Sequence, residues 1–289
     1  MKITQMLEQK KLMLSFEVFP PKNNMTFEKI HEAALEVAKL KPDFISVTYG
    51  AGGGTSQYTV KLAEEIRERT GVEPLAHLSC VSSTREAVRA QISAIQEAGI
   101  ENIMALRGDV PEGGIPSPVY HYAVDLIAEL RKAGEFCIGG ACYPEVHPDS
   151  PDQKADIRYL KEKVEAGVDF LTTQMFFDNN LFYNFLYKIR EAGITVPVFP
   201  GIMPITTPKQ VERAISMSNA AVPQRFRALV DRFGSEPEAM KQAGIAYATD
   251  QVIDLYANGI QNVHIYSMNK PDVARAIQEN VSRIVGLQL

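Results

Sequence analysis

Short β-rich runs alternate along the chain with longer amphipathic stretches that have the spacing of helices. Most neighbouring runs are centred 26 to 36 residues apart, which is the length of one strand–helix unit. Eight such units without a break in composition predict an α/β fold, a closed (β/α)₈ barrel of the TIM type, with 1–289 as one domain. An open doubly wound sheet is the alternative. The runs centre on Phe16, Ile45, Ala76, Met104, Gly140, Thr172, Val198 and Ile265.

Two stretches depart from this rhythm. The seventh and eighth runs are 67 residues apart, so 221–246 is expected to hold an extra helix or two. Residues 110–118 (VPEGGIPSP) form a loop that is too long and too rich in Pro and Gly for a plain connection. A loop of this kind after a strand is often a lid or a ligand-binding loop.

The segment 14–21 (LSFEVFPP) carries one carboxylate, Glu17, near its exit. Strand alternation places Leu14, Phe16 and Val18 on an apolar face and Glu17 on the other face. No lysine or arginine lies on the segment to pair with Glu17. A carboxylate that faces a core without a local partner has a task or a distant partner. The alternative is a glutamate that points into solvent at a strand end.

Polar side chains recur where the predicted strands end. Ligands of (β/α)₈ barrels bind at the end where the C-terminal residues of the strands meet. Polar groups on seven of the eight strands therefore indicate one site for a polar organic ligand. His77 alone would more often be a satisfied core histidine. The residues are Glu17, Ser46, Thr48, His77, Arg107, Asp109, Tyr143, His147, Gln174, and Tyr266 or Ser267.

Two further segments can be interpreted either as ligand-binding or as plain structural features. Residues 50–55 (GAGGGT) lack the lysine of a phosphate-binding loop and the last glycine of a dinucleotide fingerprint. They can bring backbone N–H groups close to a ligand, or form a plain turn. Asp156 and Lys163 share one face of a predicted helix. They can bind a sugar and a phosphate, or belong to an ordinary solvated face.

Composition narrows the class of protein. The chain has 289 residues, 45% of them hydrophobic, and a net charge of -5, which argues against a nucleic-acid partner. Three cysteines without CxxC spacing predict free, buried thiols in a reducing cytoplasm. The scattered His and acidic residues show no metal-ligand spacing, so no metal site is expected. No apolar run approaches the roughly 18 residues of a membrane span, and no signal peptide begins the chain.

Seven motifs, in their order and spacing, give the chain a specific resemblance to a known family. It resembles the bacterial, single-domain methylenetetrahydrofolate reductases over nearly its whole length. The resemblance implies an FAD-containing (β/α)₈ barrel that reduces 5,10-methylenetetrahydrofolate to 5-methyltetrahydrofolate with electrons from NADH or NADPH. The motifs are FEVFPP at 16–21, SVTYGA at 46–51, AHLSC at 76–80, ALRGD at 105–109, YPEVHP at 143–148, TQMFFD at 173–178 and PGIMP at 200–204.

The resemblance also assigns roles. It implies that Glu17 is the general acid, which protonates N10 and opens the folate ring to a 5-iminium cation. Asp109 would hold the pterin, stabilise that cation and adjust the flavin. Substrate contacts are implied for Thr48, Asp109, Gln174, Phe182 and Lys270. FAD contacts are implied for Tyr49, Ala51, His77, Arg107, Gly108, Asp109, Ala123, Tyr143, His147, Asp156 and Lys163.

The chain departs from the family pattern at a few positions. Lys270 stands where bacterial relatives often have arginine, and a lysine offers no bidentate fork to the folate glutamate tail. Tyr159 and Glu162 stand where relatives often have Asn and a basic residue near the FAD phosphates. A homo-oligomer is expected. The alternatives are a subunit that takes electrons from a partner protein instead of NAD(P)H, a silent folate- or flavin-binding barrel, and another FAD barrel such as proline dehydrogenase.

Overall fold

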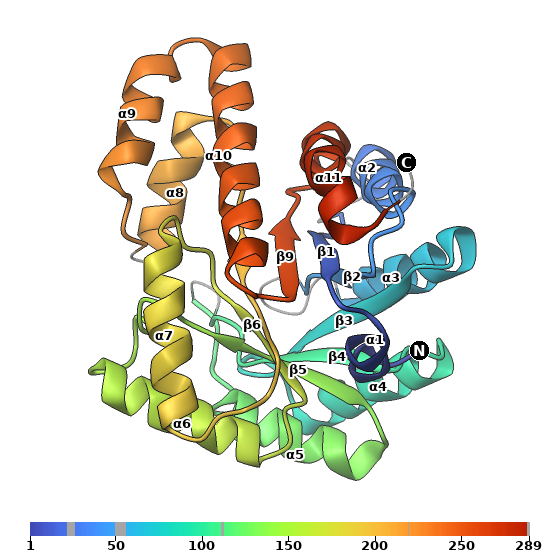
Figure 1. Cartoon of the computed structure of the whole chain (residues 1–289). Coiled ribbons are helices and arrows are strands. Elements are labelled where there is room, and N and C mark those ends of the chain that lie inside the picture. The colour runs from blue at the N-terminus through green and yellow to red at the C-terminus, as the bar shows by residue number, and fades with distance from the viewer. Residues whose placement is uncertain (22–26, 50–55, 111–112, 219, 288–289) are drawn as a thin grey trace.

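Nine strands of a single sheet, all parallel, form the wall of a barrel (Figure 1). The structure is a computed structural model that describes residues 1–21, 27–49, 56–110, 113–218 and 220–287. The strands follow the order β7-β6-β5-β4-β3-β2-β1-β9-β8. They are β1 (Met13–Val18), β2 (Phe44–Val47), β3 (Glu73–Ser79), β4 (Asn102–Leu106), β5 (Cys137–Cys142), β6 (Phe170–Thr173), β7 (Val198–Phe199), β8 (Gly201–Ile202) and β9 (Asn262–Tyr266).

The barrel closes through a strand that is divided in two. Only Pro200 separates β7 from β8; β7 pairs with β6 and β8 pairs with β9. Proline has no N–H for a sheet ladder, but the Pro200 carbonyl accepts a hydrogen bond from the His264 N–H at 2.9 Å. The predicted eight-strand barrel is therefore confirmed, with its seventh strand present as two short pieces.

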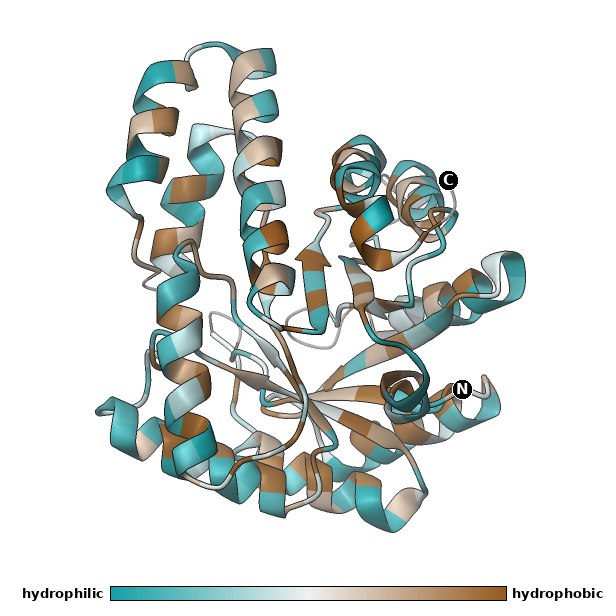
Figure 2. Ribbon diagram, viewed as in Figure 1, coloured by the Kyte–Doolittle hydropathy of each residue, from teal (hydrophilic) through white to brown (hydrophobic). Residues whose placement is uncertain are grey.

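Helices surround the sheet, and their apolar sides face it. Figure 2 shows apolar residues along the inner sides of the helices and on the strands, with polar residues on the outer helical surfaces. This is the pattern that amphipathic spacing predicts for a helix against a sheet. The surrounding helices are α2 (Phe27–Ala38), α3 (Ser56–Thr70), α4 (Arg85–Glu97), α5 (Ala123–Ala133), α6 (Gln153–Glu165), α7 (Asn179–Glu191) and α11 (Pro271–Val285).

The long connection between β8 and β9 holds three helices. They are α8 (Pro208–Ser218), α9 (Gln224–Phe233) and α10 (Pro237–Ala257), which extend together from one side of the barrel (Figure 1). The extra helix expected within 221–246 is present as α9, and α10 begins in the same stretch. A separate apolar cluster joins these helices to the barrel: the Phe226 ring stacks on Phe177 at 5.2 Å, and the Tyr247 hydroxyl donates to the Phe177 carbonyl at 2.6 Å.

A short helix, α1 (Ile3–Gln9), packs against the N-terminal end of the barrel, and no pattern in the sequence analysis predicted it. Its Ile3 and Met6 join the apolar layer of inward-facing strand residues. The Asn102 side chain fastens it, because its Oδ1 accepts from the Ile3 N–H at 2.8 Å. This end of the barrel is therefore filled, and the opposite end, where the strands terminate, is available for a ligand. The layer contains Met13, Phe44, Leu75, Met104, Cys137, Phe170 and Phe199.

Candidate active site

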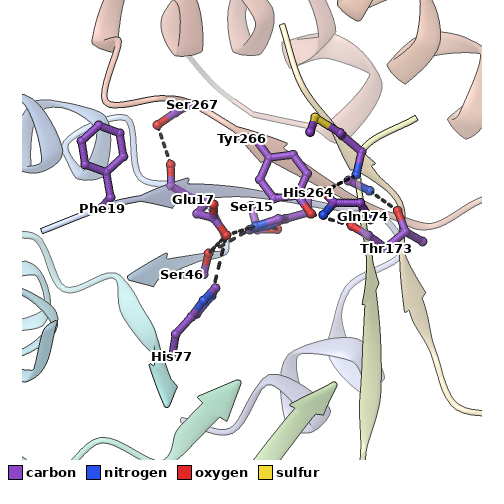
Figure 3. Close-up of polar contacts among 12 residues, drawn as sticks. Ser15, Glu17, Phe19, Ser46, His77, Thr173, Gln174, His264, Tyr266 and Ser267 are labelled. Carbon is purple, nitrogen blue, oxygen red and sulfur yellow. Dashed lines mark hydrogen bonds and ion pairs between the residues drawn. The ribbon is translucent and has the colours of Figure 1, made fainter. Parts of the chain in front are cut away.

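Above this apolar layer the interior of the barrel becomes polar. We call the C-terminal end of the strands the barrel mouth, and the polar group beneath it the acid cluster: Ser15, Glu17, Ser46, His77 and His264. These side chains come from four strands, β1, β2, β3 and β9, and converge in Figure 3. Sheet register brings them together, since Glu17 is opposite Ser46 on β2 and Tyr266 on β9. The prediction that Glu17 lies on the inner face is confirmed.

Glu17 is the centre of the acid cluster. Its Oε2 lies 3.4 Å from Ser46 Oγ, 3.7 Å from His77 Nε2 and 3.8 Å from His264 Nε2. Its side chain is 22% exposed, so the carboxyl group is reachable from the barrel mouth but largely surrounded by protein. Within the described part of the chain, Glu17 forms no ion pair with lysine or arginine. The carboxyl group therefore has polar neighbours but no lysine or arginine partner among the described residues.

His77 is a buried, neutral histidine beside this acid. Burial lowers its pKa to about 4, against the opposing pull of the Glu17 charge. Its Nε2 is buried and lacks a hydrogen-bond partner among the described residues. Buried polar atoms are nearly always paired, so this nitrogen is a candidate contact for a ligand in the barrel mouth.

The buried position of His77 predicts how stability depends on pH. Its pKa is about 4 in the folded protein and near 6.5 in an unfolded chain. Between these values the unfolded chain binds about one more proton, so the free energy of unfolding falls as the pH is lowered from 6.5 to 4. Denaturant unfolding across this range is expected to show a shallower loss for His77→Gln than for wild type. The matched variant His121→Gln, at an exposed histidine, is expected to follow wild type. Equal slopes for all three proteins contradict the assignment.

His264 is the member of the acid cluster that the sequence analysis missed. It lies on β9 two residues before Tyr266, so the same alternation that selected Tyr266 points it inward. Only 2% of it is exposed. Its ring stacks on Phe44 with centroids 6.0 Å apart and meets Tyr266 edge-on at 5.4 Å. The sequence analysis considered only the end of this strand, at Tyr266 or Ser267, and His264 is the preceding inward-facing residue.

Tyr266 forms a fixed wall of the barrel mouth. Its hydroxyl donates to the Thr173 carbonyl at 2.5 Å, and burial raises its pKa well above the usual range. The ring passes close over Gly201, where an added Cβ would lie 2.6 Å from the Tyr266 hydroxyl. A side chain at position 201 would therefore displace the ring.

A second polar group lies at the ends of β4 and β5. Arg107 Nη1 pairs with Asp149 Oδ2 at 2.8 Å, and the His147 ring meets Tyr143 edge-on at 4.4 Å. Burial lowers the pKa of His147, and the Arg107 charge adds to this effect. Gly108 has a φ of +78°, and a Cβ there would lie 2.7 Å from Ser79. This turn accordingly requires glycine.

The predicted pair Asp156 and Lys163 does lie on one helix, α6. Asp156 Oδ1 accepts from Ser150 Oγ at 2.8 Å, which ties the helix to the preceding loop. Lys163 Nζ donates to the Ala141 carbonyl of β5 at 2.7 Å, and burial lowers the pKa of Lys163. The helix thus brings both residues to the edge of β5. Their contacts with a dinucleotide stay a prediction.

Asp109 is exposed just beyond β4, near Tyr143. Burial raises the pKa of Tyr143 to about 12, and the negative charge of Asp109 adds to this shift. Directly after β6, the Gln174 Oε1 accepts from the Met175 N–H at 2.9 Å. This bond fixes the side-chain amide with its NH₂ group away from Met175. Asp109 and Gln174 are therefore polar groups at the barrel mouth, just beyond the ends of β4 and β6.

The side chains of Lys270 and Phe182 have their contacts within the protein itself. Lys270 Nζ donates to Thr206 Oγ1 at 2.6 Å, and burial lowers its pKa. Thr48 is half-buried after β2. Phe182 is fully buried on α7 and stacks on Phe176 at 5.4 Å, which is ordinary core packing. A folate ring reaches Phe182 only if that side chain moves.

Three other predicted cofactor contacts have different surroundings. Tyr49 is half-buried and packs against the core between sheet and helices. Ala123 begins α5 and is 8% exposed. Ala51, with the rest of the 50–55 turn, lies outside the described residues. Their roles stay predictions.

Several features of the described residues bear on the class of protein. Cys80, Cys137 and Cys142 are free and buried, as predicted. Within the described ranges, His, Cys, Asp and Glu side chains form no group of three or more that could hold a metal ion. Among the helices described, none is long and apolar enough to cross a membrane.

The fold and the polar barrel mouth define a TIM-barrel protein, and solved structures of low sequence identity share this architecture. A protein from Clostridium thermocellum superposes with a TM-score of 0.70 at 15% identity, over 98% of this chain and 100% of its own. The Pyrococcus horikoshii ribulose-1,5-bisphosphate carboxylase/oxygenase does so with a TM-score of 0.55 at 14% identity, over 99% of this chain and 61% of its own. These likenesses show the fold alone.

Sequence comparison shows the family. The methylenetetrahydrofolate reductase profile matches residues 2–282, and the chain belongs to this family. It is 38% identical over 270 residues to the 5,10-methylenetetrahydrofolate reductase of Pectobacterium carotovorum, covering 93% of this chain and 90% of that protein. The Escherichia coli reductase is 36% identical with the same coverage. The Arabidopsis thaliana methylenetetrahydrofolate reductase (NADH) 1 is 34% identical over 98% of this chain and 50% of its own length.

Proposed function

We propose that this protein reduces 5,10-methylenetetrahydrofolate to 5-methyltetrahydrofolate, with FAD as cofactor and NADH or NADPH as electron source. The family match over 2–282 supports the substrate class. The observation that carries the proposal is the position of Glu17 in the barrel mouth, partly exposed and among polar neighbours without a fixed cation. We also propose that 1–289 acts as one catalytic domain, in the cytoplasm, as a homo-oligomer.

Glu17 supplies the acid chemistry in this proposal. The methylene bridge of the substrate becomes reactive when N10 is protonated and its C–N bond opens to a 5-iminium cation. An acid for this step must hold a proton near neutral pH and meet the substrate from the protein side. Neutral His77 and the Ser46 hydroxyl beside Glu17 leave the carboxyl group free to hold that proton.

Residues on β3 to α6 fit a flavin dinucleotide. His77 Nε2 is a buried nitrogen that lacks a partner among the described residues, Arg107 offers a cation, and Gly108 allows close backbone approach. When bound, FAD would supply the hydride for the methylene carbon. The residues proposed to hold it are Tyr49, Ala51, His77, Arg107, Gly108, Asp109, Ala123, Tyr143, His147, Asp156 and Lys163. Exposed Glu162 on the same helix as Lys163 adds a negative charge that opposes pyrophosphate.

The substrate is proposed to lie in the same barrel mouth, beside the flavin. Asp109 would accept hydrogen bonds from the pterin and stabilise its cation, and Gln174 would donate its amide NH₂. Thr48 and Lys270 complete the proposed set, and Phe182, which is buried on α7, would join it only after its side chain moves. The C. thermocellum protein of the same fold is described as binding two copies of 5-methyl-5,6,7,8-tetrahydrofolic acid, which supports a folate in a barrel of this shape.

The proposal is tested on the purified protein. The bound flavin is released by heat and identified by mass, and the product formed from 5,10-methylenetetrahydrofolate is identified with NADH and then NADPH. FAD and 5-methyltetrahydrofolate are expected. Recovery of FMN alone contradicts the cofactor. A third outcome is that the folate oxidises the reduced flavin but neither NADH nor NADPH reduces the oxidised flavin. This result would indicate that a partner protein delivers the electrons, and the proposed electron source would be wrong.

A further inference from the structure

His264 is held more firmly than a core histidine requires. Phe44 stacks on one face of the ring, Tyr266 meets its edge, and only 2% of the residue is exposed. The ring cannot turn without moving these neighbours, so each nitrogen keeps its own direction (Figure 3). Nδ1 faces Ser15, and Nε2 faces Ser46 and the Glu17 carboxyl group.

Ser15 determines which nitrogen carries the proton. Its Oγ lies 2.8 Å from His264 Nδ1 and 3.2 Å from the Val263 carbonyl oxygen. A hydroxyl has one proton, and a carbonyl oxygen can only accept. Both contacts are hydrogen bonds only if Ser15 donates to Val263 and His264 Nδ1–H donates to Ser15. Neutral His264 then has a lone pair on Nε2.

That lone pair determines which groups donate and which accept in the other hydrogen bonds of the acid cluster. Ser46 Oγ lies 3.2 Å from His264 Nε2 and 3.4 Å from Glu17 Oε2. If Ser46 donates its single proton to Nε2, its oxygen is free to accept from Glu17. The chain is then Glu17 to Ser46, to His264, to Ser15, to the Val263 carbonyl. If His264 is neutral, only a protonated Glu17 completes it, so the chain then favours the acid form. The two distances at Ser46 are long, as catalytic hydrogen bonds often are without a ligand.

Three titratable groups within or beside the acid cluster, those of His77, Tyr266 and Cys142, carry no charge near neutral pH. His77 on β3 has a pKa of about 4. The Tyr266 hydroxyl on β9 donates its proton to the Thr173 carbonyl, and burial raises the pKa of the Cys142 thiol on β5 to about 12. The hydrogen-bond chain therefore acts on Glu17 without a competing ion among these neighbours.

We propose that Ser15 and His264 are positioning residues that keep Glu17 protonated for catalysis, with Ser15 setting the tautomer of His264 and Ser46 carrying the contact to Glu17. This inference rests on the proposed function, in which Glu17 is the acid. Neither Ser15 nor His264 is required to touch the substrate. Among the described residues no hydrogen bond joins the Ser15 side chain to Glu17, so its effect on catalysis would pass through His264 and Ser46.

The test substitutes Ser15→Ala in the flavin-loaded protein. Without the Ser15 hydroxyl, nothing holds the ring proton of His264 on Nδ1, so the proton can reside on Nε2. Nε2–H then donates to Ser46, and Ser46 donates to an ionised Glu17. We expect the folate half-reaction to slow by about 5- to 30-fold near neutral pH, the equivalent of one or two kcal/mol. Because the acid form is no longer favoured, the pH above which this rate falls should shift downward. Flavin reduction by the nicotinamide should not change.

Two control variants separate positioning from general damage. Ser15→Thr keeps the hydroxyl and should restore the wild-type pH profile. Ser282→Ala removes a buried hydroxyl on α11, which donates to the Glu279 carbonyl, and should change neither half-reaction. If the pH profile of Ser15→Ala matches that of Ser282→Ala, the inference is wrong.

A spectroscopic readout tests the tautomer independently of activity. The ¹⁵N spectrum of the histidine rings, assigned with His264→Gln, should show His264 protonated at Nδ1 in wild type and a shift toward Nε2 in Ser15→Ala. Protonation at Nε2 in wild type would overturn the inference. If wild type reduces no folate although His264 has the Nδ1 proton, the proposed function fails while the tautomer assignment stands.

Discussion

Replacing Glu17 by glutamine should nearly abolish folate reduction and leave flavin reduction by NADH or NADPH largely intact. The amide keeps the size of the side chain, but it cannot give a proton to N10. Loss of a general acid typically lowers the rate by about 10²- to 10⁴-fold. Stopped-flow absorbance separates the two half-reactions, because the flavin bleaches in the first and recovers its colour in the second.

The matched control is Glu73→Gln. Glu73 begins β3 at the filled end of the barrel, where it pairs with the N-terminal ammonium group, so the same chemical change falls on the same sheet but far from the mouth. We expect both half-reactions to survive there. If Glu17→Gln slows both half-reactions equally, Glu17 supports the structure and is not the acid.

The second large effect is expected for Asp109→Asn. The variant should bind folate more weakly and slow the folate half-reaction by about 10- to 100-fold, since a hydrogen bond to a charged group contributes about 1.5–3 kcal/mol. The amide keeps the shape but loses the charge that accepts from the pterin and balances its cation. Retention of FAD should change less, because many other contacts are proposed to hold it.

The same substitution should raise the midpoint potential of the flavin, because a nearby negative charge disfavours the anionic reduced form. Spectroelectrochemistry measures this sign directly. Asp231→Asn, at an exposed position on α9, serves as the control and should shift neither quantity. An unchanged or lower potential for Asp109→Asn, together with unchanged folate affinity, would place Asp109 outside the site.

Strand periodicity was sufficient to predict the barrel and the inward direction of Glu17. A two-residue period decides which face a side chain occupies, and parallel strands in one barrel bring their ends together. The division of the seventh strand at Pro200 was not predictable from its pattern. It depends on pairing with β6 on one side and β9 on the other, which are far away in sequence. The α1 helix was missed because it is only seven residues long and depends on distant contacts such as Asn102.

In the candidate site, too, local sequence patterns predicted which element a residue lies on, but not the contacts that depend on how the elements pack. Asp156 and Lys163 were placed on one helix correctly, but the bond from Lys163 to the Ala141 carbonyl depends on how α6 packs against β5. His264 was not predicted because only the residues at the strand ends were considered. The acid cluster also includes the inward-facing residue of β9 that precedes Tyr266. Reading every inward position of β9 would have found it.

In the proposed reaction, electrons pass from the bound flavin to 5,10-methylenetetrahydrofolate. The most direct measurement reduces the flavin anaerobically with NADH or NADPH, removes the nicotinamide, and adds the folate while absorbance is followed. We expect the flavin colour to return in a single turnover, with one equivalent of 5-methyltetrahydrofolate formed per flavin. Flavin that stays reduced in the presence of excess folate would contradict it.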